Sequence, residues 1–138
     1  MNILIDTNVI LDQLLKREPF YEDAESIRVL SENGHINSYI SASAITDIYY
    51  IARKEIRDKE TVITLIENLL KTTSIAAVTE TSIYEALVLK WDDFEDAVQY
   101  VAGKSISADY IITRNKSDFD GSKIEVLSPD EFLSRITS

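Results

Sequence analysis

Four aspartates that lie far apart in the chain each follow or flank an apolar segment that is expected to be buried. They are Asp6, Asp47, Asp96 and Asp118. If these carboxylates met at one place without a counter-ion, their mutual repulsion would raise their pKa values. A hard divalent cation relieves such repulsion, and oxygen-only ligands suit Mg²⁺ or Mn²⁺. The chemistry to look for is therefore that of a carboxylate-bound metal.

A metal held in this way has a definite use in hydrolysis. Bound divalent ions activate water and stabilise an in-line displacement at a phosphodiester. Further polar side chains lie next to the same segments and are candidates for supporting the metal or contacting a phosphate. They are Asn8, Thr113, Arg114 and Asn115.

The aspartates can meet only if the chain folds so that distant segments share one edge. Short apolar runs alternate with segments of helical periodicity, which favours a parallel sheet covered by helices on both faces. The predicted strands are residues 2–5, 36–42, 74–78, 109–114 and 123–128. The predicted helices are residues 6–15, 20–33, 43–56, 59–71, 81–90, 93–104 and 129–136. We therefore expect an α/β fold, a three-layer α/β/α sandwich whose central, mainly parallel sheet has about five strands. Functional groups in such sheets gather outside the carboxyl ends of the strands.

The segment DDFEDAVQYVAGK, residues 92–104, has four acids among its first five residues. Asp92 is the expected N-cap, with Glu95 three residues later in a pairing like a capping box. Asp93 then reads as a solvated acid of the first turn. Asp96 is left free to face a metal, and the helix N-terminus is expected to lower its pKa.

Four segments, ILIDTNVILD, SAITDIYYIARK, DDFEDAVQY and ADYIITRNKSDF, occur in an order that resembles the PIN-domain family. The likeness is greatest to the VapC-like ribonucleases, the toxin components of bacterial toxin–antitoxin pairs. It covers nearly the whole chain and implies one PIN-like domain over residues 1–138. It also implies a metal-dependent endoribonuclease that cuts RNA with Mg²⁺ or Mn²⁺, forms homodimers and is inhibited by a cognate antitoxin.

Carried over by position, the first three acids of the family match Asp6, Asp47 and Asp96. The last element supplies Asn115 and Asp118, and which of the two faces the metal stays open. Many family members have glutamate where this chain has Asp47, so the side chain is one methylene shorter here. On residue type alone, Asp6 also suits a helix cap and Asp118 a turn. The four segments taken together favour a metal ligand at Asp6, whereas for Asp118 both roles stay open.

The composition limits the alternatives. The chain has no cysteine, so thiolate zinc sites and thiol catalysis are excluded, and a reducing cytoplasm is the compatible location. No apolar run approaches a membrane span, and the first residues lack the basic region of a signal peptide. His35 is the only histidine, which leaves little room for a serine–histidine–aspartate triad.

The net charge of −10 is unfavourable for a general nucleic-acid binder. It keeps open a second reading, in which the chain is a PIN-fold binding module that is catalytically weak or inactive. It also suits a basic protein partner. An acceptor-aspartate regulatory domain fits less well, because Asp6 lacks the neighbouring acids and Lys123 is misplaced for that role.

Overall fold

The computed structural model describes residues 1–137 and contains one five-stranded sheet with the order β3-β2-β1-β4-β5. All four strand pairs are parallel, as the alternating pattern predicts. The strands are β1 (Asn2–Ile5), β2 (Asn37–Ser41), β3 (Ser74–Ala76), β4 (Tyr110–Ile112) and β5 (Glu125–Leu127). All strands except β1 are shorter than predicted, because fewer of their residues pair with a neighbouring strand.

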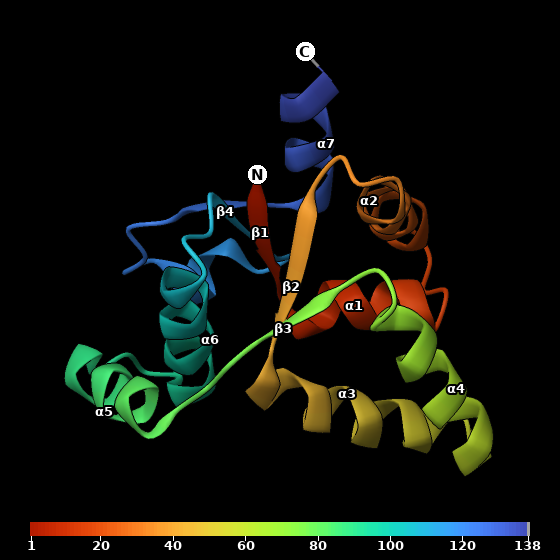
Figure 1. Cartoon of the computed structure of the whole chain (residues 1–138), viewed down its shortest axis with the longest axis horizontal. Coiled ribbons are helices and arrows are strands. Elements are labelled where there is room, and N and C mark those ends of the chain that lie inside the picture. Colours follow the sequence, from red (N-terminus) through yellow and green to blue (C-terminus); the bar gives the residue numbers. More distant parts are fainter. Residues whose placement is uncertain (138) are drawn as a thin grey trace.

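Every predicted helix is present, with ends shifted by a few residues (Figure 1). The helices are α1 (Thr7–Leu14), α2 (Tyr21–Glu32), α3 (Ala42–Glu55), α4 (Lys59–Leu69), α5 (Glu80–Leu89), α6 (Phe94–Ser105) and α7 (Pro129–Thr137). A short 3₁₀ helix, η1 (Lys116–Phe119), forms where the sequence predicts only a turn. None of these helices, within residues 1–137, has the length and apolar character needed to cross a membrane.

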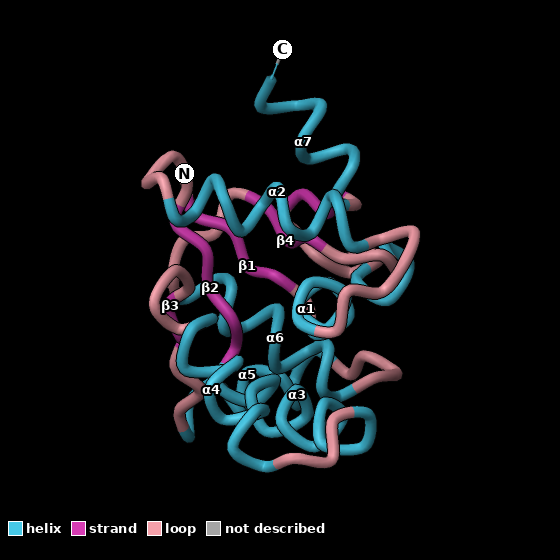
Figure 2. The backbone as a smooth tube through the Cα atoms, turned by 90° about the vertical axis from the view of Figure 1, so that its right-hand side faces the viewer, coloured by secondary structure: helices cyan, strands magenta, loops and turns pink. Residues whose placement is uncertain are grey.

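The side chains of β1 alternate between two cores. Ile3 and Ile5 pack with apolar residues of α1, α2 and α7, whereas Leu4 packs on the opposite face with Tyr100 and Ala102 of α6. Figure 1 shows the same arrangement, with α1 and α2 on one side of the sheet and α6 on the other, and α5 lying outside α6, while Figure 2 looks at the molecule from the side of α1 and α2. The predicted three-layer sandwich is confirmed.

The strand order places the functional edge between β1 and β4. The chain leaves β1 toward β2 on one side and returns to β4 on the other, so the carboxyl ends of β1 and β4 form the point where the order reverses. Ile5 pairs with Ile112, and the next residues, Asp6 and Thr113, therefore emerge side by side. The backbone N–H of Asp6 donates to the carbonyl oxygen of Ile112 at 2.9 Å, which fixes this register.

The start of α6 differs from the prediction. The N-cap is Asp93, whose Oδ1 accepts the backbone N–H of Asp96 at 3.0 Å. The assignment of Asp92 as the cap, with Glu95 as its partner, is wrong. The helix begins at Phe94, one residue later than that assignment requires. Asp93 is therefore a structural cap, and Asp92 is left without a capping role.

Candidate metal and hydrolytic site

Asp6 is the most firmly held of the predicted acids. Its Oδ1 accepts the backbone N–H of Thr7 at 2.7 Å and the side-chain amide of Gln99 at 3.0 Å. Its Oδ2 accepts the hydroxyl of Thr113 at 2.8 Å and a long bond of 3.4 Å from Asn8. Asp6 is thus both the cap of α1 and a buried carboxylate whose orientation several elements fix.

Gln99 is a site residue that the sequence analysis missed. It lies in α6, one turn after Asp96, with only 1% of its surface exposed. Its Nε2 donates to Asp6, while its Oε1 is buried without a hydrogen-bond partner among the described residues. A sequence signal existed, because Gln99 is the only polar residue in the otherwise apolar run 97–102.

Asp96 faces the same place from α6. Burial, and then the charges of Asp93, Asp6 and Asp118, raise the pKa of the Asp96 carboxyl to about 7. The expectation that the helix N-terminus lowers this pKa is wrong, because desolvation and three neighbouring carboxylates act in the opposite direction. The same interactions place Asp6 and Asp118 within electrostatic reach of Asp96.

Asp47, on α3, lies beside this group but pairs with a different acid. Partial desolvation and a side-chain hydrogen bond with Asp47 raise the pKa of Glu95 to about 7, and Asp93 and Asp96 add to the effect. Asp47 is not among the charges that act on Asp96. Its short side chain thus reaches the first turn of α6 at Glu95, a residue that the sequence analysis considered only as a capping partner.

Asp118 is carried by η1 and is exposed, with a side chain that makes no hydrogen bond or ion pair within residues 1–137. Asn115 is also exposed; its backbone N–H donates to Thr113 Oγ1 at 3.1 Å, and its carbonyl oxygen accepts the backbone N–H of Asp118 at 3.0 Å. Of the two residues that the terminal motif offers, Asp118 is the one that acts electrostatically on Asp96.

The predicted supporting residues have distinct positions. Thr113 is fully buried and bonds Asp6 directly, and Asn8 links Asp6 to Thr113 through two long contacts of 3.4 Å. Arg114 does not stand free for a phosphate. Its Nε pairs at 2.7 Å with Asp12, which is 1% exposed, and its guanidinium lies 4.0 Å from the centre of the Phe20 ring. Arg114 therefore joins α1 to the loop after β4, and the structure does not support its predicted phosphate contact.

The donor set suits a hard divalent ion, since it consists of carboxylates and no thiol or imidazole. Among residues 1–137, however, no three acidic or histidine side chains are already gathered closely enough to hold a metal. Burial, and then the charges of the neighbouring carboxylates, raise the pKa of Asp96, and a bound cation would compensate that repulsion. When bound there, a divalent ion would supply a Lewis acid and an activated water.

The fold is an α/β sandwich with carboxylates at the β1–β4 edge, and this combination is typical of a metal-dependent hydrolase. The pattern of the family described as PIN domain matches residues 2–117. The chain belongs to the PIN-domain family, which confirms the resemblance drawn from the four motifs.

Individual relatives agree with this assignment. The chain is 29% identical over 139 residues to Ribonuclease VapC1 of Aquifex aeolicus, covering 96% of this chain and 94% of that protein. The crystal structure of VapBC2 from Rickettsia felis, bound to a DNA fragment from their promoter, gives a TM-score of 0.70 at 15% identity. It covers 93% of this chain and 98% of that one. A toxin–antitoxin complex from Klebsiella pneumoniae gives a TM-score of 0.69 at 20% identity, covering 92% and 97%. At these identities the two structures show a shared fold.

Proposed function

We propose that this protein is a Mg²⁺- or Mn²⁺-dependent endoribonuclease, the toxin of a toxin–antitoxin pair, formed by a single domain over residues 1–138. The observation that carries the proposal is that Asp96 and Asp118 line one cavity and that both Asp6 and Asp118 act electrostatically on Asp96, although the three acids come from separate parts of the chain. The similarity to Ribonuclease VapC1 supports RNA as the substrate.

In this proposal Asp6, Asp96 and Asp118 hold the ion, and Asp47 completes the acidic set. Gln99 and Thr113 orient the Asp6 carboxylate through hydrogen bonds of 3.0 and 2.8 Å. The chain has no histidine at this edge, so the carboxylates themselves are the groups available to accept protons. Attack of water on phosphorus in line with the departing 3′-oxygen leaves a 5′-phosphate and a 3′-hydroxyl.

A protein partner is part of the same proposal. The similar structure from Klebsiella pneumoniae is a toxin–antitoxin complex, and the net charge of −10 suits a basic partner. We also propose a homodimer, supported by exposed apolar side chains on α5. A cytoplasmic location, suggested by the absence of cysteine, belongs to the proposal as well.

The test is cleavage of single-stranded RNA in the presence of Mn²⁺ by the natural chain, Asp6→Asn and Asp96→Asn. Removing one charge that stabilises the transition state costs on the order of a hundredfold in rate or more. Glu60→Gln is the matched control, because Glu60 is an exposed acid at the start of α4, away from the sheet edge. Equal rates in all four proteins would leave the non-catalytic binding module as the better description.

A further inference from the structure

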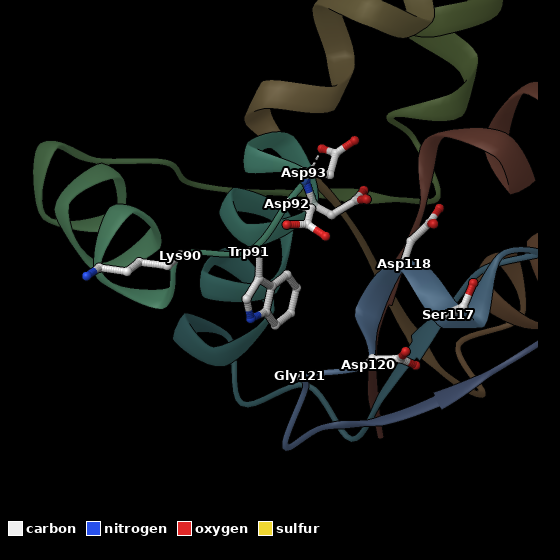
Figure 3. Close-up of a pocket in the computed structure, with 9 residues that line it drawn as sticks. Lys90, Trp91, Asp92, Asp93, Ser117, Asp118, Asp120 and Gly121 are labelled. Carbon is white, nitrogen blue, oxygen red and sulfur yellow. Dashed lines mark hydrogen bonds between the residues drawn. The ribbon is translucent and has the colours of Figure 1, made fainter.

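A second feature borders the acidic site and is not explained by metal binding. A cavity of about 380 Å³ extends from Asp96 and Asp118 to the indole of Trp91. Figure 3 shows Trp91 between the start of α6, where Asp92 and Asp93 lie, and the turn that carries Asp120 and Gly121. The cavity is thus continuous with the proposed catalytic centre and has an aromatic wall.

The indole is held in place on several sides. It stacks on Tyr100, with ring centres 5.0 Å apart and an angle of 25° between the planes, and it meets the edge of Phe119. Tyr100 is itself fixed, since its hydroxyl accepts the backbone N–H of Lys123 at 3.2 Å. A Cβ atom at Gly121 would lie 2.6 Å from Trp91 Nε1, so only glycine leaves the indole where it is. Trp91 is therefore a rigid platform that is partly exposed toward the cavity.

The polar walls of the cavity offer hydrogen-bond acceptors almost exclusively. Five aspartates line it, against one lysine and one serine. The carboxylates of Asp92 and Asp120 make no hydrogen bond or ion pair with any residue of the described chain, and the proposed metal set does not include them. Both side chains are exposed to solvent, so a ligand that bonds to them replaces water and carries hydrogen-bond donors, whereas a second phosphate would be repelled.

We propose that the Trp91 cavity binds a nucleobase next to the scissile phosphate and prefers guanine. This inference rests on the proposed ribonuclease function and names the specificity of the same site. Bases of single-stranded RNA are commonly recognised by stacking on an aromatic side chain and by hydrogen bonds along the Watson–Crick edge. A neutral base can occupy the Trp91 end of this acidic cavity while its phosphate lies at the other end, at the metal that Asp96 and Asp118 would hold.

Guanine is the base that matches the walls. Its Watson–Crick edge presents two adjacent donors, N1–H and the N2 amino group, which one carboxylate accepts together. Adenine and cytosine place an acceptor beside their amino group, and uracil places its one N–H between two carbonyl oxygens. Each of these three bases would therefore place an oxygen or nitrogen lone pair against a carboxylate, whereas guanine would not.

Trp91 is the only tryptophan in the chain, so its fluorescence reports on this cavity alone. The full-length protein in Mg²⁺ is titrated with GMP, AMP, CMP and UMP, and separately with N-acetylarginine amide. Excitation at the red edge of the indole absorption avoids absorption by the nucleotides. We expect GMP to quench at a concentration about tenfold lower than UMP, a ratio within the range that stacking and paired hydrogen bonds provide.

Variants separate stacking from hydrogen bonding. Calorimetry should show GMP affinity reduced about tenfold in Trp91→Leu and largely retained in Trp91→Phe, because phenylalanine still stacks. The double variant Asp92→Asn/Asp120→Asn keeps the platform and should lose the preference for GMP over UMP. This second variant changes exposed side chains only, so it tests the inference even if Trp91→Leu does not fold.

Two results would overturn the inference. One is equal GMP affinity in the natural chain and in both sets of variants. The other is quenching by the arginine amide but by no nucleotide, which would assign the cavity to a cationic side chain of a protein. If the variants cleave RNA with an unchanged base preference, this inference is overturned and the proposed ribonuclease function stands. If the protein binds GMP through Trp91 but does not cleave RNA, the proposed ribonuclease function is overturned and the base-binding cavity stands.

Discussion

At the residue scale, the hydrogen bonds of Asp6 determine which of its oxygens can serve a cation. Oδ1 already accepts two short bonds, from Thr7 and Gln99, whereas one of the two bonds to Oδ2 is the 3.4 Å contact from Asn8. The longer contact is the weaker one, so a metal displaces it at the least cost. Oδ2 is therefore the oxygen that we expect to bind the ion, with Thr113 and Gln99 left in place.

Gln99→Leu should lower the affinity for Mn²⁺ and the rate of RNA cleavage by about tenfold each, since groups that orient metal ligands typically contribute 10- to 100-fold. Stability should change less than these two quantities, because leucine removes a buried carbonyl that has no partner in the described chain, which offsets the lost hydrogen bond to Asp6, and Asp6 Oδ1 keeps its bond from Thr7. Titration calorimetry with Mn²⁺ measures the metal affinity, and the melting temperature measures the stability. Unchanged metal affinity would show that Gln99 only fills space.

The acids of α6 predict how stability depends on pH. The pKa of Asp96 rises from 3.8 to about 7 on folding, and that of Glu95 from 4.5 to about 7. The folded chain therefore binds more protons than the unfolded chain between these values. The contribution of both groups to stability is full below the unfolded pKa values and is lost as the pH rises through about 7.

The metal-free protein should accordingly melt at a higher temperature near pH 5.5 than near pH 8, and Asp96→Asn should flatten this dependence. Mg²⁺ competes with these protons, so the rise in melting temperature that it produces should be larger at pH 8. Thermal melts with EDTA or with Mg²⁺ at both pH values measure this. A melting temperature of the EDTA-treated protein that rises with pH would contradict the raised pKa values.

At the scale of the elements, the sequence predicts the alternating order, the parallel sheet and the convergence of Asp6 with Asp96, because periodicity and strand ends are local properties. It does not predict which of two adjacent acids caps α6, since Asp92 and Asp93 have equal chemistry and packing selects the first turn. Nor does it predict the pairing of Asp47 with Glu95. That contact depends on how α3 crosses α6, which only the tertiary structure determines.

Helix α5 carries an apolar surface that the fold leaves uncovered. Tyr84 is 63% exposed, Leu87 55% and Val88 77%, although all three lie in a regular helix packed against α6. Such a patch is typical of an interface. Val88→Asp should convert a dimer into a monomer, measured by light scattering after gel filtration, without changing the melting temperature at low protein concentration. Ser134→Asp, at an exposed position of α7, is the control. A natural chain that is monomeric at about 100 µM would contradict the expected homodimer.

At the scale of the whole molecule, the charge balance opposes the proposed substrate. The chain has 24 acidic and 14 basic residues, and two basic side chains close to the site, one in the loop after β4 and one at the start of η1, are paired internally. Arg114 binds Asp12, and Lys116 lies 2.8 Å from Glu131. RNA must then be held by the metal and by contacts to its bases more than by cations along its backbone.

This balance predicts an unusual salt dependence. A protein that neutralises many phosphates of single-stranded RNA loses affinity steeply with salt, with a slope of about −0.7 per phosphate contact, because bound cations are released. Here long-range repulsion is screened as salt rises and offsets that loss. The affinity of Asp6→Asn for a short fluorescent RNA, measured by anisotropy at fixed Mg²⁺, should change by less than about fivefold between about 50 and 200 mM KCl. A loss of about a hundredfold would require a cationic RNA path that the charges of this chain do not provide.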